Sequence, residues 1–282
     1  MKKLIFAAAA VAGMGAFALE SANVVGYTEF ATETKKQPSF GACFTPINGA
    51  MTYKLKDLVP TDFNVDEDMI QIINPTTLAT DARYVYMSKE IADAAAEEDG
   101  EEPGAYDELI GWWDPVLGVG EDGAAAGDTE IKVGQAFLGL FKSGVDIKFQ
   151  SSGSVPLTST GISTDAKKQP FFANYLPKTI KLGAIVPEGF NVDEDMIQVI
   201  NPASLATDAR YVYMSKEIAD AAAEEDGEAP GAYDELIGWW DPVIGVGEDG
   251  ASANDADVVA GAAFLGLFKS GVNITFQFPA AL

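Results

Sequence analysis

The chain has 282 residues, 48% of them hydrophobic, and its 18 basic and 43 acidic residues give a formal net charge of −25. A surface this negative repels phosphate groups, which argues against nucleic acid and anionic membranes as partners. The absence of histidine and the single cysteine, Cys43, argue against His-dependent catalysis, His-ligated zinc and an intramolecular disulfide.

The first 18 residues have the pattern of a bacterial export signal. Lys2 and Lys3 precede an apolar run over residues 4–15, and Ala16-Phe17-Ala18 places small residues where a signal peptidase reads the chain. The run is too short to cross a bilayer as an anchor. We expect a signal peptide over 1–18 and a secreted, extracellular or cell-surface protein without a transmembrane segment. The periplasm is the alternative compartment.

The mature chain is a tandem repeat. Residues 63–123 recur as residues 190–250 with five differences, four of them mild, which indicates two units of one fold. We place a β-rich repeat 1 at 19–150 and a β-rich repeat 2 at 151–282, joined by a short flexible linker, Ser151-Ser-Gly-Ser154. Cys43 falls in the first repeat, where we expect a small buried side chain; an intermolecular disulfide is the alternative.

Alternating apolar and polar residues predict strands along each unit. In repeat 1 the expected strands are 23–30, 40–47, 69–73, 83–87, 109–113, 130–141 and 145–150. A turn at Lys142-Ser-Gly144 predicts a β-hairpin over 137–150, repeated at 264–277. The pattern predicts a mainly β protein of two tandem β-sandwich-like or barrel-like domains.

One helix interrupts the strands in each unit. Ser88 is a suitable N-cap for residues 89–98, and Gly100 ends the segment. Glu97, Glu98 and Asp99 put negative charge at the C-terminal end, where the helix dipole disfavours it. We therefore expect a short surface helix, frayed toward an acidic loop.

Acidic residues are candidate calcium ligands. Asp62-x-Asn64-x-Asp66-x-Asp68 begins like an EF-hand, but Glu67 and Ile73 occupy the positions of the required glycine and of the final glutamate. Looser calcium sites and a plain solvated acidic surface remain as alternatives; calcium is the only cofactor considered. The candidate metal ligands are Asp66, Asp68, Asp99, Glu121, Asp122, Asp193, Asp195, Asp226, Glu248 and Asp249.

Paired tryptophans are the second candidate site. In a strand, one indole of Trp112-Trp113 and one of Trp239-Trp240 would face outward and could stack on a glycan. The alternative, which we favour, packs all four in a core or a domain interface. Carboxylate-dependent hydrolysis is a further alternative, but no acidic pair stands out, so no catalytic residue is assigned and an enzyme is not expected.

Terminal strands favour self-association. The strands at 23–30 and 273–278 lie close to the two ends of the mature chain, and terminal strands at sheet edges can pair with another subunit. A head-to-tail arrangement of such subunits forms a filament or lattice. Partners expected besides the chain itself are a glycan or a cationic surface.

Short motifs carry a family resemblance. The mature start Ser21-Ala-Asn-Val-Val-Gly-Tyr27, followed by Asp68-Met-Ile-Gln71, Gly111-Trp-Trp-Asp114 and Gly134-Gln-Ala-Phe137, resembles a loose group of exported bacterial tandem β-domain proteins of unknown function. The resemblance implies an exported, repeated β-domain and no active-site residues. The combined expectation is a secreted or cell-surface structural protein that self-assembles into a filament or surface layer. The first alternative is a calcium- or glycan-binding extracellular module.

Overall fold

The computed structural model describes most of the chain from Val25 onward. Its described residues are 25–31, 39–41, 52–73, 80–120, 123–154, 158–164, 170–200, 207–247 and 250–280. The predicted signal peptide at 1–18 and Cys43 lie outside these ranges. Within the ranges, no helix has the length and apolar composition needed to cross a membrane.

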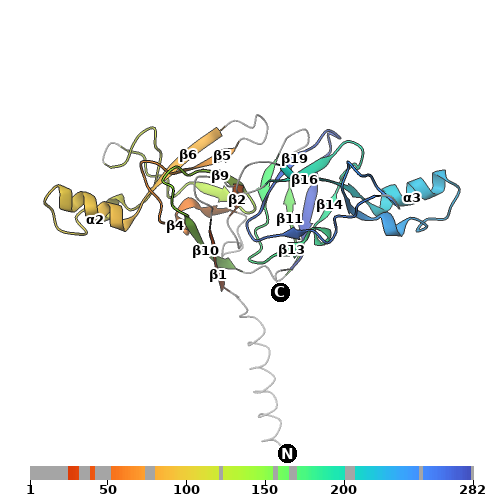
Figure 1. The fold of residues 1–282 in the computed structure, drawn as a ribbon, viewed down its shortest axis with the longest axis horizontal. Helices are drawn as coiled ribbons and strands as arrows, with labels where there is room; N and C mark the ends of the chain where they lie inside the picture. Colours follow the sequence, from red (N-terminus) through yellow and green to blue (C-terminus); the bar gives the residue numbers. More distant parts are fainter. Residues whose placement is uncertain are drawn as a thin grey trace, which may run out of the picture.

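The protein is mainly β and contains two equivalent units, each with one α-helix among its described residues (Figure 1). In the first unit a five-stranded antiparallel sheet has the order β2-β9-β5-β6-β7, and a three-stranded sheet has the order β1-β10-β4. The strands are β1 (Val25–Ala31), β2 (Ser39–Gly41), β4 (Leu58–Thr61), β5 (Met69–Ile73), β6 (Thr80–Met87), β7 (Gly111–Trp113), β9 (Ala136–Leu140) and β10 (Lys148–Ser154). A ribbon of β3 (Thr52–Lys54) and β8 (Glu130–Lys132) completes the unit.

The second unit repeats this topology. Its five-stranded sheet has the order β12-β19-β15-β16-β17, its three-stranded sheet β11-β20-β14, and its ribbon pairs β13 with β18. The strands are β11 (Thr160–Ser163), β12 (Phe171–Ala173), β13 (Ile180–Lys181), β14 (Val186–Glu188), β15 (Met196–Ile200), β16 (Thr207–Met214), β17 (Gly238–Trp240), β18 (Asp257–Val258), β19 (Ala263–Leu267) and β20 (Thr275–Phe278).

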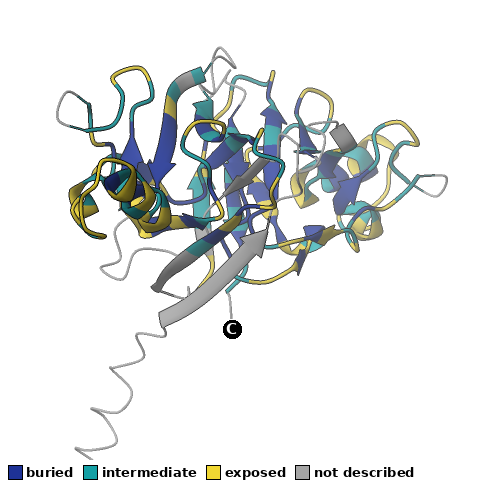
Figure 2. Ribbon diagram, turned by 60° about the vertical axis from the view of Figure 1, so that its left-hand side comes forward, coloured by how far each residue is buried: buried dark blue, intermediate teal, exposed yellow. Residues whose placement is uncertain are grey.

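The core of each unit lies between its two sheets, as in a sandwich. In the first unit Ile70 and Phe137 of the larger sheet pack in one buried cluster with Leu58 and Phe149 of the smaller sheet. The alternation of apolar residues along each strand places these side chains on the inner face. In the described residues each sheet remains open, so the sandwich-like alternative holds over the barrel (Figure 2).

The predicted hairpin over 137–150 is wrong. β9 pairs with β2 and β5, whereas β10 pairs with β1 and β4, so the two strands belong to different sheets. The chain turns a corner at residues 141–147 and crosses the core instead of folding back. The second unit makes the same crossing between β19 and β20.

A buried carboxylate holds that corner. Asp68 is 1% exposed; its Oδ1 accepts hydrogen bonds from the backbone N–H groups of Lys142 (2.8 Å) and Ser143 (3.0 Å), and its Oδ2 accepts one from Asn64 N (3.0 Å). Asp195 makes the three equivalent bonds in the second unit. A charged acceptor with several N–H donors is a strong arrangement, and it fixes the chain where it leaves the larger sheet.

A left-handed residue precedes this loop. Asp62 has φ +61°, and Gly189 has φ +82° at the equivalent position. A Cβ on Gly189 would come within 2.8 Å of the Asn273 carbonyl oxygen. The Asp-to-Gly difference between the copies therefore reflects backbone geometry, because Asp and Gly are among the residues that most readily adopt this conformation.

Three other expectations need correction. The Ser151–Ser154 segment is the end of β10, paired with β1, and not a flexible linker, so the strand runs past the predicted boundary at 150. The C-terminal strand β20 lies between β11 and β14, so it is central and not at an edge; β1 is at an edge. The strand predicted over 130–141 is divided into β8 and β9.

The units pack against each other beside β2 and β12. Ala173 N donates to the Gly134 carbonyl oxygen at 2.7 Å, and Gln135 and Phe172 form an isolated β-bridge. Val133 of the first unit is buried in the core cluster of the second unit. Helices α2 (Lys89–Glu98) and α3 (Lys216–Glu225) lie at opposite ends of the molecule (Figure 1).

We predict that Asp68→Ala lowers the free energy of unfolding of the first unit by about 3 kcal/mol, because three N–H groups lose a charged acceptor. Urea unfolding followed by circular dichroism measures the loss. The matched control is Asp66→Ala, an exposed residue two positions away, which should cost less than about 0.5 kcal/mol. Equal costs for the two variants would contradict the assignment.

We predict that Gly134→Ala destabilises the contact between the units. A Cβ here would overlap Ile162 Cδ1, the far end of a flexible side chain, and lie 3.1 Å from Ile162 Cγ1. Because that side chain can shift, we expect a cost near the low end of the roughly 1–3 kcal/mol typical of overpacking. Gly100→Ala is the control, since Gly100 has a similar φ, +80° against +76°, and nothing within 4 Å of its Cβ position. Thermal unfolding should show the larger loss for Gly134→Ala; a larger loss for Gly100→Ala would contradict the prediction.

Candidate functional site

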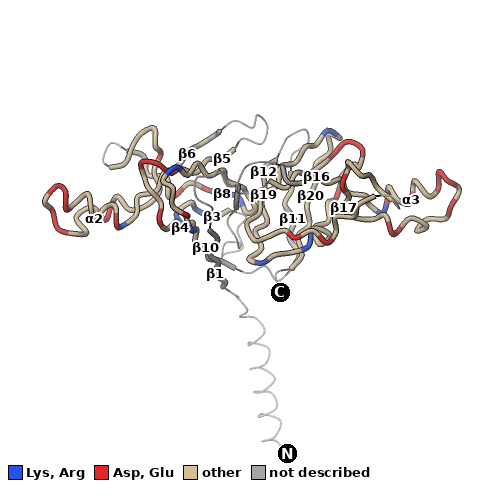
Figure 3. Tube along the Cα trace, viewed as in Figure 1, with Lys and Arg blue, Asp and Glu red and all other residues tan. Residues whose placement is uncertain are grey.

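Acidic residues gather around α2 and α3, at the far ends of the protein (Figure 3). At the α2 end, Lys89 Nζ bonds Asp93 Oδ1 (3.1 Å) and Asp107 Oδ1 (3.0 Å). Asp93 Oδ1 also accepts from Gly104 N at 2.9 Å. Ser88 caps the helix as expected, accepting from Ile91 N. These bonds hold the acidic segment after the helix against it, so several of its carboxylates already have partners within the chain.

Two candidate metal ligands accept hydrogen bonds from tyrosines. Tyr106 OH donates to Asp99 Oδ2, and Tyr233 OH donates to Asp226 Oδ2, both at 2.8 Å. The hydrogen bond, with a smaller contribution from desolvation, raises the pKa of each tyrosine. The neutral phenols therefore stay in place as donors over the physiological range.

The other candidate metal ligands are not brought together. Asp68 and Asp195 are buried corner residues with both oxygens hydrogen bonded, whereas Asp66 and Asp193 are exposed. Glu121, Asp122, Glu248 and Asp249 lie outside the described residues. Among the residues described, no three Asp, Glu or Cys side chains form a group that could hold a metal ion. Calcium binding stays a prediction.

The Asp128 carboxylate forms ion pairs with two lysines. Its Oδ1 is 2.8 Å from Lys54 Nζ and 2.9 Å from Lys56 Nζ. These hydrogen bonds, and the two positive charges, lower the pKa of Asp128 to about 2. The carboxylate is solvent-exposed, so the pair is sensitive to salt and contributes little to stability.

The four tryptophans are buried. Trp112 and Trp113 are 1% and 7% exposed, and Trp239 and Trp240 are 0% and 6% exposed. No indole of either pair faces outward, which agrees with the packed arrangement that we favour from the sequence. Their indole faces are therefore closed to a sugar ring, and the geometry does not support glycan stacking on these residues.

Hydrogen bonds fix the indoles in place. Trp112 Nε1 donates to Leu58 O and Trp113 Nε1 donates to Leu109 O, both at 2.8 Å. Trp112 also packs edge to face against Phe63 and Tyr86. These contacts make the first Trp of each pair a link between the two sheets, which is a structural role.

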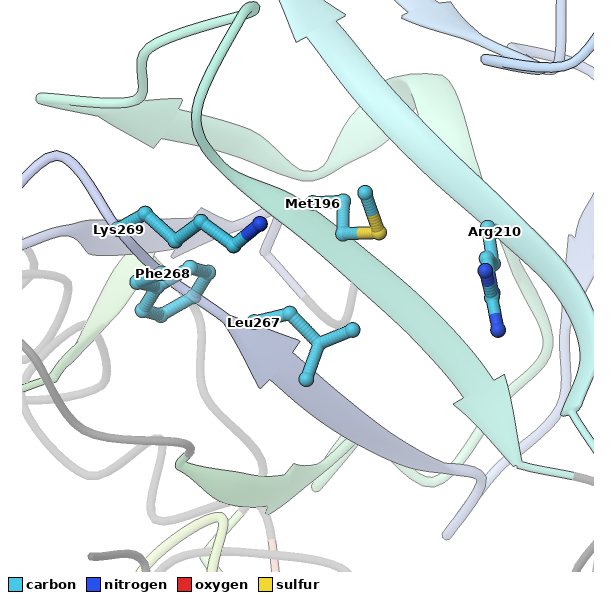
Figure 4. Close-up of a pocket in the computed structure, with 5 residues that line it drawn as sticks. All are labelled: Met196, Arg210, Leu267, Phe268 and Lys269. Atoms are coloured by element: carbon cyan, nitrogen blue, oxygen red, sulfur yellow. The ribbon is translucent and has the colours of Figure 1, made fainter.

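Sequence reasoning missed a pocket on the outer face of the larger sheet. In the second unit Met196, Arg210, Leu267, Phe268 and Lys269 line a pocket of about 250 Å³ (Figure 4). Met196 pairs directly with Leu267 across β15 and β19, which puts both on one face. The available signal was Arg210: it and Arg83 are the only arginines in the chain, at equivalent positions in the two copies.

Exposed apolar loop tips were also missed. After β7, Val116 and Leu117 are 82% and 58% exposed; after β17, Val243 and Ile244 are 87% and 57% exposed. We call these two residue pairs the apolar tips. In the sequence each tip is a turn of Asp-Pro, two aliphatic residues and Gly. The two aliphatic residues take positions where polar side chains are usual in an exposed turn.

Comparison with family models, with curated proteins and with solved structures finds no match to the chain.

We predict that Asp128 titrates with a pKa of about 2 and that Lys54→Met raises this value toward that of a free aspartate. NMR titration of the carboxyl carbon measures the shift. Because the folded-state pKa is depressed, any stability from this pair is present above the ordinary carboxyl pKa and is lost as the pH falls toward 2. Lys132→Met is the control; an unchanged Asp128 pKa in Lys54→Met would contradict the assignment.

Proposed function

We propose that the chain is a secreted or cell-surface structural protein that associates with copies of itself and carries no enzymatic activity. The observation that supports this most directly is the contact between the two units. One unit packs against its own near-copy through backbone and apolar contacts, so the fold already presents surfaces that recognise the same fold.

The contact is built for close approach. Ala136, Ala173 and Ala263, from β9, β12 and β19, form one small buried cluster. Small side chains let the strands of the two units come close enough for the Ala173 N to Gly134 O hydrogen bond. Tyr53 packs against the cores of both units. This combination resembles a subunit interface more than a flexible tether.

Edge strands limit how copies can add to one another. β4 and β14 are edge strands, and each contains a proline, Pro60 or Pro187, which cannot donate to a new neighbour. Strand addition at these two edges is therefore disfavoured. At these two edges we infer that copies contact each other through side chains and not by strand addition.

Charge sets the conditions for association. A net charge of −25 makes copies repel each other at low ionic strength, and salt screens that repulsion. High acidity also keeps a surface protein soluble until it assembles. Assembly should therefore become easier as monovalent salt rises from low to physiological concentration.

We predict that the purified mature protein forms filaments, sheets or discrete oligomers visible by negative-stain electron microscopy, with larger species at physiological salt than at low salt. Sedimentation velocity at matched concentrations measures the shift. A strictly monomeric protein across concentration, salt and millimolar calcium would overturn the proposal.

A further inference from the structure

The apolar tips are held in a defined shape. In the first unit Asp114 Oδ1 accepts from Val116 N at 2.8 Å, and the Asp114 carbonyl accepts from Gly118 N at 3.0 Å. Asp241 makes the equivalent bonds to Val243 N (2.8 Å) and Gly245 N (2.9 Å). These hydrogen bonds to the first residue of the turn already fix its backbone. Docking of the two aliphatic side chains therefore costs little further backbone conformational entropy.

The exposure of these tips needs an explanation. Single exposed aliphatic residues are ordinary on a protein surface, but here two adjacent ones are exposed, and both copies of the unit repeat the arrangement. The single substitution within the tips, Leu117 to Ile244, keeps the residue aliphatic. The turn supplies an apolar projection where a polar turn residue would normally lie.

The pocket on the larger sheet has the complementary chemistry. Met196 and Leu267 form its apolar floor, and Arg210 and Lys269 flank them (Figure 4). Among the described residues, no carboxylate forms an ion pair with either cation. Small-molecule sites usually occupy roughly 300–1,000 Å³. At about 250 Å³, this pocket suits one or two aliphatic side chains better than a ligand.

The first unit carries the same residues at the equivalent positions. Met69 pairs with Leu140 across β5 and β9, Arg83 is opposite Gln71, and Lys142 follows Phe141. Each unit therefore presents both a tip and the residues of a pocket. We call the residue sets Met69, Arg83, Leu140, Phe141 and Lys142, and Met196, Arg210, Leu267, Phe268 and Lys269, the acceptor sites.

We propose that an apolar tip of one molecule docks in an acceptor site of a second copy of this chain. The aliphatic side chains of the tip fill the floor, and the two cations face the acidic residues that flank the tip in the sequence. This inference rests on the proposed self-association and names the surfaces that perform it.

Charge complementarity selects a second copy as the occupant. The chain has 43 acidic and 18 basic residues, so a place where two cations flank an apolar floor is uncommon on its surface. In the sequence each tip follows an aspartate, Asp114 or Asp241, and is followed by an acidic pair, Glu121-Asp122 or Glu248-Asp249. A cationic surface around the acceptor would favour an acidic, apolar partner, and the chain itself supplies one.

Topology directs the contact between molecules. β7 and β17 are the sheet edges opposite β2 and β12, so the tips project from the sides of the units that face away from the internal contact. The acceptor sites lie on the sheet faces instead. A tip-to-acceptor contact joins two different surfaces, and contacts of this kind form rings or open chains of subunits.

Cross-linking between two single-cysteine proteins tests the contact directly. Both carry Cys43→Ser; one adds Leu117→Cys on a tip, the other Met196→Cys in an acceptor site. After mixing and mild oxidation, a disulfide-linked dimer of the two chains is expected on a denaturing gel. Val145→Cys, 48% exposed and away from the tips, replaces Leu117→Cys in the control. Equal yields from the two mixtures would overturn the proposal.

Assembly assays separate this inference from the proposed function. The variant Val116→Ser, Leu117→Ser, Val243→Ser, Ile244→Ser should raise the concentration for half-assembly about tenfold or more, as loss of a central apolar contact does. Arg83→Glu with Arg210→Glu should do the same, and the control Val145→Ser with Val272→Ser should not. Circular dichroism confirms folding of each variant.

The outcomes are distinct. If the tip variant and the arginine variant assemble at the same concentration as the wild type, the docking contact is overturned and self-association still stands. A wild type that never assembles would overturn both.

Discussion

A buried carboxylate in each unit is the interaction on which the fold depends. Asp68 and Asp195 each accept three backbone N–H groups, two of them from the corner where the chain leaves the larger sheet. Without that acceptor, the partly buried N–H groups of the corner would lose a charged partner, which is costly. With it, β9 and β10 enter different sheets, and the sandwich encloses Ile70, Phe137 and Phe149.

The sandwich in turn defines what the surface can do. Both indoles of each Trp pair are used to close the core, so the conspicuous aromatic motif is structural. Many acidic side chains at the ends of the protein bond lysines, tyrosines or backbone groups nearby. The surfaces that we propose for contact between copies are the apolar tips and the acceptor sites, and neither appeared as a motif.

Local patterns predicted local structure well. Ser88 and Gly100 marked the helix correctly, and the strands expected at 69–73 and 83–87 correspond to β5 and to most of β6. The alternation also gave the mainly β, sandwich-like class. What failed required long-range information: the turn at Lys142–Gly144 has hairpin composition, but Asp68, more than seventy residues earlier, takes its N–H groups.

The candidate sites were predicted less well, for a related reason. A carboxylate in a sequence shows neither its burial nor its partners, so Asp68 and Asp195 resembled metal ligands although their oxygens are hydrogen bonded to the backbone. The acceptor site combines strands β15, β16 and β19 with the corner after β19. Only the pairing of those strands brings Met196, Arg210 and Leu267 together.

The five differences between residues 63–123 and 190–250 contrast with the far larger divergence of the segments beside β2 and β12. Those divergent segments form the internal contact, where Gly134 of one unit meets Ala173 and Ile162 of the other. Two identical halves could exchange partners between chains during folding, since each contact surface would fit every neighbouring copy equally well. Dissimilar contact surfaces favour pairing of the two units within one chain. Divergence at the internal contact therefore disfavours domain swapping, while the near-identical outer regions give one chain two copies of the same surface.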